Sequence, residues 1–299
     1  DLKFVELHSL KPPYRSNMAL TADQISFYQD NGYLLLEQAI PSSVLTSLRD
    51  TVDRFIEASR AVQTSNRIYD LDQSHSADNP RVRRLKDPHI RDPLFKQIAE
   101  CSTIVDPVCE LLGGTVRFDH SKLNFKHPGT NAEINWHQDW AFYPHTNDDI
   151  LAVGVLIEDC TPECGPLMVI PGSHKGPVFD HHHNGIFTGG VNTDAIGDLA
   201  DKAVPLIAPA GSLTIHHVRT LHASGNSSTN TLRPLLLFSY TAVDAFPIFS
   251  SYDLQEYDSR ILRGAPVREG RMAALPFRIH LPQEPGTDSI YDNQESMQR

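Results

Sequence analysis

The sequence predicts a mainly β protein with flanking helices, in which helical segments come first and a jelly-roll core follows. Two observations lead to this fold class. Residues 20–113 show helical spacing of apolar side chains between capping signals, whereas short β-branched or alternating runs separated by Gly and Pro turns begin near residue 115. Many short strands of this kind are typical of a sandwich or barrel. We therefore expect an N-terminal helical part at about 20–113 and a cupin-like, double-sheet jelly roll at about 115–243.

The first helix is predicted from a capping box. Thr21 is an N-cap residue, and Gln24 lies three residues further on, where its side chain can return a hydrogen bond. The helix should end at Asn31-Gly32, because glycine readily adopts the left-handed conformation found after a helix C-terminus. Residues 33–36 should then form a short apolar strand.

Two more helices and a series of strands are expected. One helix should open at Pro41 and carry an apolar face as far as residue 56. Another should cover 94–112, where Gly113-Gly114 ends it. The expected strands lie at 116–118, 122–126, 133–138, 150–158, 167–170, 212–217 and 235–241.

Two weakly patterned segments lie outside these elements. Residues 174–211 interrupt the strands and residues 245–299 follow them, and long segments without regular pattern are often functional. We expect both to act as lid or tail segments over a site. No repeat, low-complexity tract or dividing linker is evident, so the expectation is a single domain over residues 1–299.

Composition excludes several classes of protein. The chain has 299 residues, 26 basic and 37 acidic side chains, a formal charge of −11 and 40% hydrophobic residues, which is the balance of a folded domain. The longest apolar run, 150–157, is far shorter than the roughly 20 residues of a membrane span. An acidic chain without a long Lys/Arg cluster argues against nucleic-acid binding. Four cysteines make no disulfide framework, so a cytoplasmic location is expected.

His137 and Asp139 form the first candidate metal-binding motif. In a strand, residues two apart project to the same face, so both side chains can reach one ion. A bare His-x-Asp pair is common and needs a third ligand, which His222 can supply after the apolar run 212–217. Two imidazoles and one carboxylate form the facial triad of non-haem Fe(II) oxygenases, which leaves positions for a chelating cosubstrate and O₂.

Arg233 adds a second element to this pattern. It lies eleven residues after His222 and leads directly into an apolar strand. A buried arginine is costly unless it has an anion to pair with, and its planar guanidinium matches a carboxylate. The order His137, Asp139, His222, Arg233 is therefore much more specific than any one of its members.

Together these pieces resemble the phytanoyl-CoA dioxygenase family of Fe(II)/2-oxoglutarate-dependent oxygenases. The resemblance covers roughly residues 20–243. Five stretches carry it: Asn31-Gly32-Tyr33; Asn124-Phe125-Lys126-His127-Pro128-Gly129; His137-Gln138-Asp139-Trp140 with Tyr143-Pro144; Gly165-Pro166-Leu167 with residues 171–176; and residues 217–226 together with the later Arg233. The family's fold is a double-stranded β-helix, or jelly roll, with helices outside, in agreement with the elements above.

The resemblance implies a set of site residues and cofactors. His137, Asp139 and His222 would ligate Fe(II), and O₂ and 2-oxoglutarate would be cosubstrates. Arg233 would bind the distal carboxylate of 2-oxoglutarate. Three further residues would also contact this cosubstrate, namely Ser224, Lys86 and Asn124. The implied reaction is the oxidation of a small molecule, foremost its hydroxylation, with succinate and CO₂ as products. Halogenating relatives replace the carboxylate ligand by a small residue, so Asp139 favours oxygenation.

Several alternatives remain open from the sequence. A jelly-roll sensor that binds metal without turnover has little need of Arg233, and a zinc hydrolase would want a general base that is not evident. On an alternating strand only one of His216 and His217 can face inward, and the resemblance places the metal ligand at His222. The run 181–183 of three histidines has no assigned role. Substrate identity, desaturation as an outcome and oligomeric state are not determined.

Overall fold

The computed structural model describes residues 19–249, 253–274 and 290–295. Two antiparallel sheets form its core, an eight-stranded sheet in the order β1-β11-β6-β13-β4-β3-β2, with β14 also on β4, and a four-stranded sheet in the order β10-β7-β12-β5. The larger sheet consists of β1 (Tyr33–Leu36), β2 (Tyr69–Leu71), β3 (Val82–Lys86), β4 (Val116–Lys126), β6 (Ile150–Leu156), β11 (Leu213–His217), β13 (Arg233–Thr241) and β14 (Ile261–Arg263). The smaller sheet consists of β5 (Ile134–His137), β7 (Met168–Val169), β10 (Val204–Pro205) and β12 (His222–Ser224). This arrangement confirms the predicted jelly-roll fold class.

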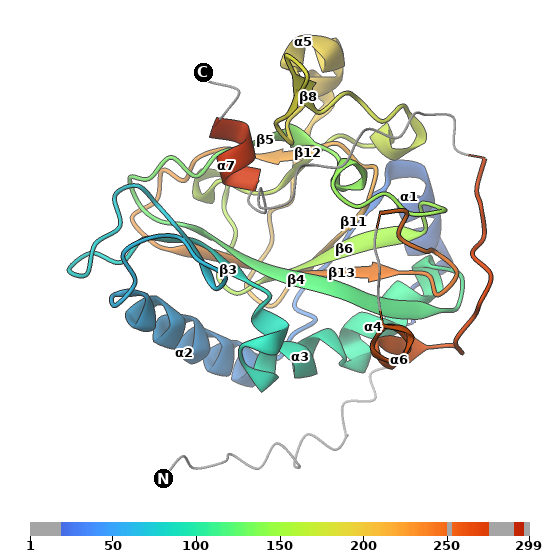
Figure 1. Ribbon diagram of the computed structural model, residues 1–299, viewed down its shortest axis with the longest axis horizontal. Helices are drawn as coiled ribbons and strands as arrows, with labels where there is room; N and C mark the ends of the chain where they lie inside the picture. Colours follow the sequence, from blue (N-terminus) through green and yellow to red (C-terminus); the bar gives the residue numbers. More distant parts are fainter. Residues whose placement is uncertain (1–18, 250–252, 275–289, 296–299) are drawn as a thin grey trace.

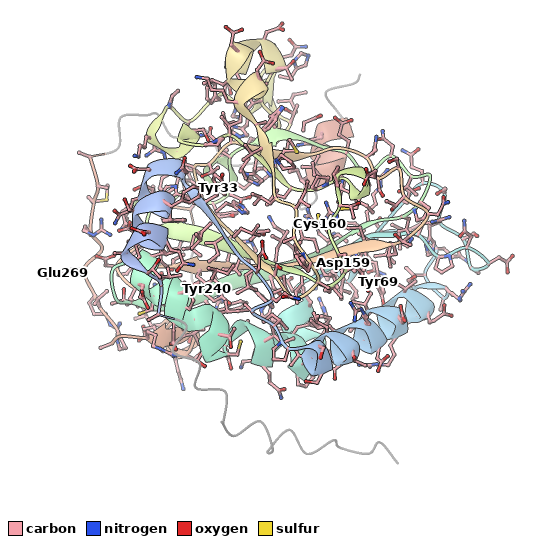
Figure 2. The ribbon with its side chains drawn as sticks, turned by 180° about the vertical axis from the view of Figure 1, so that it is seen from behind. Tyr33, Tyr69, Asp159, Cys160, Tyr240 and Glu269 are labelled. Atoms are coloured by element: carbon pink, nitrogen blue, oxygen red, sulfur yellow. The ribbon has the colours of Figure 1, made fainter. Side chains whose placement is uncertain are left out.

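Helices cover the outer face of the larger sheet (Figure 1). They are α2 (Ser42–Ser59), α3 (Pro93–Ala99) and α4 (Ser102–Leu111), and α1 (Ala22–Asn31) lies at one end of the sheet. The main apolar core lies between these helices and the sheet, where Leu48, Phe95 and Val105 are fully buried. Tyr240 of β13, labelled in Figure 2, points to this side, and its hydroxyl donates a hydrogen bond to the carbonyl of Ala99, 2.7 Å away. The opposite face of the sheet is therefore left for a site between the two sheets.

The N-terminal predictions hold at the first helix. The Thr21 side chain accepts a hydrogen bond from the Gln24 backbone, and the Gln24 side chain accepts one from the Thr21 backbone, which is the expected capping box. Gly32 ends the helix with a φ of 75°, and β1 then begins at Tyr33 as predicted.

Three expectations about the elements are wrong. The single helix expected at 94–112 is two helices, because Cys101 takes an extended backbone that lets the apolar faces of both α3 and α4 reach the sheet. The two strands expected at 116–118 and 122–126 are one strand, β4, because β4 pairs with β13 on both sides of a register shift and Ser121 lies opposite Phe238. The N-terminal part is not only helical, since β2 and β3 extend the larger sheet beyond β4.

The two weakly patterned segments contain short elements. Residues 174–211 hold a two-stranded sheet of β8 (His182–His183) and β9 (Ile186–Phe187), the short helix α5 (Thr193–Ile196) and the 3₁₀ helix η6 (Gly197–Lys202), beyond the smaller sheet (Figure 1). The last segment contains α6 (Leu254–Ser259) and α7 (Ile290–Glu295), while residues 250–252, 275–289 and 296–299 lie outside the described part. The lid role of both segments, like the single-domain organisation, stays a prediction.

A helix that crosses a membrane must be long and apolar. None of the helices within the described residues has the necessary length and apolar character. The cytoplasmic location stays a prediction.

Candidate active site

His137, Asp139 and His222 come together between the two sheets. His137 is the last residue of β5, Asp139 opens the 3₁₀ helix η3 (Asp139–Ala141), and His222 opens β12. β5 and β12 are neighbours, and their register places His222 directly opposite His137. One potential ligand atom from each of the three buried side chains lies within 4.8 Å of the other two. The tertiary structure thus brings together the three residues predicted from sequence.

The two imidazoles are oriented for metal binding. Nδ1 of His137 donates to the carbonyl of Asn135 at 2.8 Å, and Nδ1 of His222 donates to that of Thr220 at 2.9 Å. A carbonyl only accepts hydrogen bonds, so each Nδ1 carries the proton and each Nε2 keeps a free lone pair. These Nε2 atoms lie 4.0 and 3.9 Å from Oδ1 of Asp139.

Burial and neighbouring charges set the protonation states of the three side chains. Burial lowers the pKa of His137 to about 4, and burial with the nearby His137 holds the pKa of His222 well below its usual value. Burial raises the pKa of Asp139, but Lys122, His216 and His222 outweigh it and leave this pKa well below the usual range. The site therefore offers two neutral nitrogens and one carboxylate at neutral pH, a donor set that fits Fe(II).

The neighbouring histidines take different places. His216 on β11 faces the site, with its Nε2 3.5 Å from Oδ2 of Asp139, whereas Nε2 of His217 lies 3.9 Å from Oδ2 of Asp148. His216 therefore contacts the carboxylate from the larger sheet and is not part of the triad.

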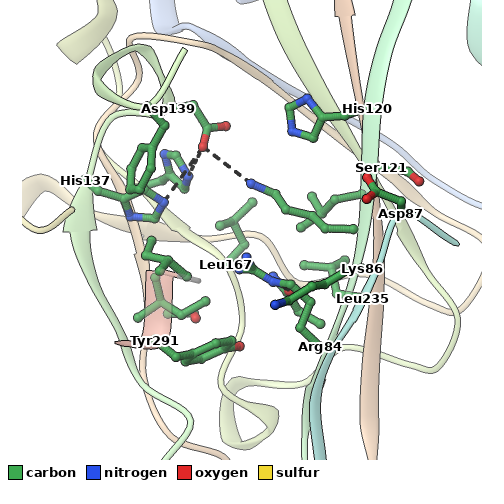
Figure 3. Close-up of a pocket in the computed structure, with 18 of the residues that line it drawn as sticks. Arg84, Lys86, Asp87, His120, Ser121, His137, Asp139, Leu167, Leu235 and Tyr291 are labelled. Atoms are coloured by element: carbon green, nitrogen blue, oxygen red, sulfur yellow. Dashed lines mark hydrogen bonds and ion pairs between the residues drawn. The ribbon is translucent and has the colours of Figure 1, made fainter. Parts of the chain in front are cut away.

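A cavity of about 490 Å³ adjoins the triad. The triad lies on the wall formed by the smaller sheet, and Arg84 and Lys86 of β3 lie across from it (Figure 3). Alternate residues of β4 line the cavity, because successive side chains of a strand point to opposite faces. Four of the lining residues of β4 alternate in this way, namely His120, Lys122, Asn124 and Lys126, and Ser121 also lines the cavity next to the register shift between β4 and β13.

Arg233 lies in this cavity, as predicted for an anion-binding residue. It is only 5% exposed, its guanidinium donates to the carbonyl of Gly165, and its Nε has no hydrogen-bond partner among the described residues. Gly165 has a φ of 69°, and a Cβ there would lie 2.5 Å from the carbonyl oxygen of Gly225. The loop after the 3₁₀ helix η4 (Pro162–Cys164) therefore depends on glycine to hold Arg233 in place.

The other predicted cosubstrate residues also line the cavity. Ser224 is buried on β12, and Asn124 accepts a hydrogen bond from Nε of Arg84 at 2.8 Å. Nζ of Lys86 lies 2.7 Å from Oδ1 of Asp70, so a carboxylate already compensates its charge. The structure thus places all seven predicted site residues on one cavity. Lys86 is the least available of them for binding 2-oxoglutarate, because Asp70 already compensates its charge.

Sequence reasoning missed three residues that line the cavity. Nζ of Lys122 lies 3.6 Å from Oδ1 of Asp139, and Arg84 stacks over the ring of Tyr291 of α7 at 5.4 Å. The alternation from Lys122 to Lys126 was a readable signal, since β4 carries a polar residue at each inward position. Tyr291 gave no signal, because it lies far along the chain from every motif.

The first histidine of the run 181–183, within the segment 174–211, has a structural role. His181 is fully buried, its Nδ1 donates to the carbonyl of Phe179 at 2.8 Å, and its Nε2 accepts from the backbone N–H of Gln138 at 2.9 Å. His181 therefore fixes the backbone between two triad residues, whereas His183 is exposed.

Comparison with known proteins identifies the family. The model of the phytanoyl-CoA dioxygenase family matches residues 28–235. The chain belongs to the phytanoyl-CoA dioxygenase family. A probable alpha-ketoglutarate-dependent hypophosphite dioxygenase of Stutzerimonas stutzeri is 32% identical over 92% of this chain and 98% of its own. The L-proline trans-4-hydroxylase of Streptomyces griseoviridis is 28% identical over 74% of this chain and 86% of its own.

Solved structures agree on the fold of this phytanoyl-CoA dioxygenase family member. EctD from S. alaskensis with bound Fe has a TM-score of 0.64 at 23% identity, covering 84% of this chain and 88% of EctD. Membership of the family confirms the predicted enzyme class, a non-haem iron and 2-oxoglutarate-dependent dioxygenase. It leaves the sensor and zinc hydrolase hypotheses without support.

Proposed function

We propose that His137, Asp139 and His222 hold Fe(II), and that the enzyme hydroxylates a small molecule. The observation that carries this proposal is the pair of imidazoles whose Nδ1 protons are held by backbone carbonyls, with both Nε2 atoms about equally distant from the buried, ionised Asp139. Three protein ligands leave coordination positions for a chelating cosubstrate and O₂.

Arg233 would pair with the distal carboxylate of 2-oxoglutarate. Its Nε lacks a partner within the described residues, and a guanidinium binds a carboxylate through two parallel hydrogen bonds. Arg84 contributes a second buried guanidinium to the same cavity, and its Nε donates a hydrogen bond to the neutral side-chain amide of Asn124. Ser224 and Asn124 line the path between Arg233 and the triad, while Lys86 supports the wall through Asp70.

The reaction converts R–H, 2-oxoglutarate and O₂ into R–OH, succinate and CO₂. Iron bound by the triad would supply the activation of O₂ and the decarboxylation of 2-oxoglutarate. The side chains of this protein orient the cosubstrate, keep Asp139 ionised and keep both ligand imidazoles neutral. No general acid or base is required for this role.

The substrate is proposed to be a small molecule. Relatives are named for hypophosphite, L-proline and ectoine, all of which are small and polar. The cavity of about 490 Å³ is in the range of small-molecule sites.

The test is an absorption measurement on purified protein under anaerobic conditions. Addition of Fe(II) and 2-oxoglutarate should produce a weak metal-to-ligand charge-transfer absorption band in the visible range, and His137→Ala should abolish this band. His183→Ala, a change at an exposed histidine, serves as the matched control and should retain the band. A wild-type protein that shows no band would refute the assignment.

A further inference from the structure

The charge of the cavity is opposite to the charge of the chain. The chain carries a formal charge of −11, yet seven Lys and Arg side chains line the cavity against two carboxylates, Asp87 and Asp139. The seven basic side chains are Arg67, Arg84, Lys86, Arg91, Lys122, Lys126 and Arg233. Lys126 is largely neutral at pH 7, because burial and the neighbouring Arg233 lower its pKa to about 6. Cations gathered in a partly desolvated cavity repel each other unless anions offset them.

Some of these basic side chains already have an ionic or hydrogen-bond partner within the protein. Lys86 pairs with Asp70, and Lys126 donates to the carbonyls of Ala132 and Gly225, at 2.5 Å each. Arg233 and the neighbouring Arg84 form the end of the cavity assigned above to 2-oxoglutarate. The cations that remain are Lys122, Arg67 and Arg91.

Lys122 lies next to the triad and far from Arg233. On the larger sheet, Arg233 is opposite Lys126, and Lys122 lies four residues further along β4, which at the rise of a strand is about 13 Å. Its Nζ is 3.6 Å from Oδ1 of Asp139, the carboxylate proposed to bind the metal. With that carboxylate committed to Fe(II), the ammonium group faces the cavity beside the metal centre.

Arg67 and Arg91 lie at the same level of the cavity as Lys122. Lys86 is opposite Lys122 in the sheet, and Nε of Arg91 donates to its carbonyl at 3.4 Å. The other end of the Arg91 guanidinium donates to the carbonyl of Arg67 at 3.0 Å. Within the described ranges, no ion pair joins either arginine to a carboxylate.

We propose that the primary substrate is a small anion, with a carboxylate or phosphorus oxyanion group that Lys122 binds beside the metal centre. Arg67 and Arg91 supply a positive potential that attracts the anion to this end of the cavity. This inference rests on the proposed function, because it assumes that 2-oxoglutarate occupies the end at Arg233. Lys122 is thereby a residue that determines substrate specificity.

The experiment measures binding to the protein loaded anaerobically with Fe(II) and saturating 2-oxoglutarate. Hypophosphite, methylphosphonate and propionate are titrated by calorimetry beside two neutral partners, dimethyl methylphosphonate and propionamide. At least one anion should bind at least tenfold more tightly than its neutral partner, and its affinity should fall as KCl is added. A preference for the first two anions assigns a phosphorus group, and a preference for propionate assigns a carboxylate.

Variants of Lys122 separate substrate binding from support of Asp139. Lys122→Met should weaken anion binding by about 10- to 100-fold, because a charge-assisted hydrogen bond is lost, while the Fe(II)–2-oxoglutarate band persists. Lys122→Arg, which keeps the charge, should retain most of the affinity. Lys96→Met, at a lysine on the outer helix α3 whose side chain is 62% exposed, is the control and should bind like the wild type.

Three results would overturn the inference. They are no binding by any anion, equal binding by the neutral partners, and loss of the band in Lys122→Met to the same degree as loss of anion binding. The last result would make Lys122 a support for Asp139 alone. A missing band in the wild type would instead refute the proposed function, so the two failures are distinguishable.

Discussion

At the scale of single residues, the site is built from buried polar groups whose partners are incomplete until ligands bind. Arg233 is almost fully buried, contacts one backbone carbonyl and keeps an unpartnered Nε within the described part of the chain. Leaving a buried cation in this state costs free energy, which a bound carboxylate recovers. The same reasoning applies to the free Nε2 atoms of His137 and His222.

Replacing Arg233 tests this account. Arg233→Ala should raise the dissociation constant for 2-oxoglutarate by roughly 10- to 100-fold, because a two-pronged, charge-assisted contact is lost. Iron affinity should change less than about twofold, since Arg233 lies at the other end of the cavity from the triad. Titration of the visible band with 2-oxoglutarate and with Fe(II) measures both constants. Parallel loss of the two affinities would mean that Arg233 only supports the fold.

At the scale of elements, glycines allow the close approach that the sheet and helices require. Gly32 ends α1 with a φ of 75°, and its carbonyl accepts hydrogen bonds from the backbone of His217 and from Oγ1 of Thr220 at 2.9 and 2.8 Å. A Cβ at Gly32 would lie 2.3 Å from Nδ1 of His174 and 2.6 Å from Oγ1 of Thr220. The turn from α1 to β1 is therefore fitted against the segments that lead to His222.

Two alanine substitutions separate crowding from backbone strain. Gly113 has a φ of 77° with nothing within 4 Å of an added Cβ, so Gly113→Ala should cost only the strain, about 1 kcal/mol of unfolding free energy. Gly32→Ala adds the overlap and should cost about 2 kcal/mol more. Denaturant unfolding of both variants measures the difference. Equal losses would show that His174 and Thr220 move aside freely.

At the scale of the whole molecule, the fold keeps several histidines neutral inside an acidic protein. Burial lowers the pKa of His127 to about 4 and that of the triad residue His137 to about 4 as well. His127 is 7% exposed, and its Nε2 accepts a hydrogen bond from the backbone N–H of Val82 at 3.2 Å. Such groups bind a proton more readily in the unfolded chain than in the folded one.

Stability of the iron-free protein should therefore fall in mild acid. Above pH 6.5, His127 is neutral in both states and contributes no pH dependence; as the pH falls from 6.5 to about 4, only the unfolded state gains its proton. At about 1.4 kcal/mol per pKa unit, this residue accounts for a loss of roughly 3 kcal/mol. His127→Gln, which retains an acceptor, should flatten the stability profile measured by denaturant unfolding, and the exposed control His183→Gln should not. A profile unchanged by His127→Gln would contradict this account.

Local sequence determined the elements whose signals lie within a few residues. The capping box at Thr21, the glycine at 32 and the alternation of short strands were sufficient for α1, β1 and the jelly-roll class. The spacing of His137 and Asp139, with the later His222 and Arg233, indicated the candidate site, because metal and carboxylate chemistry restrict the residue types that can serve. The resemblance to the family was needed to prefer His222 over the neighbouring histidines and to add Ser224, Lys86 and Asn124.

The tertiary structure decided what depends on pairing between distant segments. The register of β12 on β5 places His222 opposite His137, and the pairing of β3 with β4 brings Arg84 to Asn124. The cationic cavity exists only because alternate residues of β4 face the smaller sheet, so Lys122 reaches Asp139 from a separate strand. These contacts arise from sheet register, a property set by the packing of the whole core and not by any short stretch of sequence.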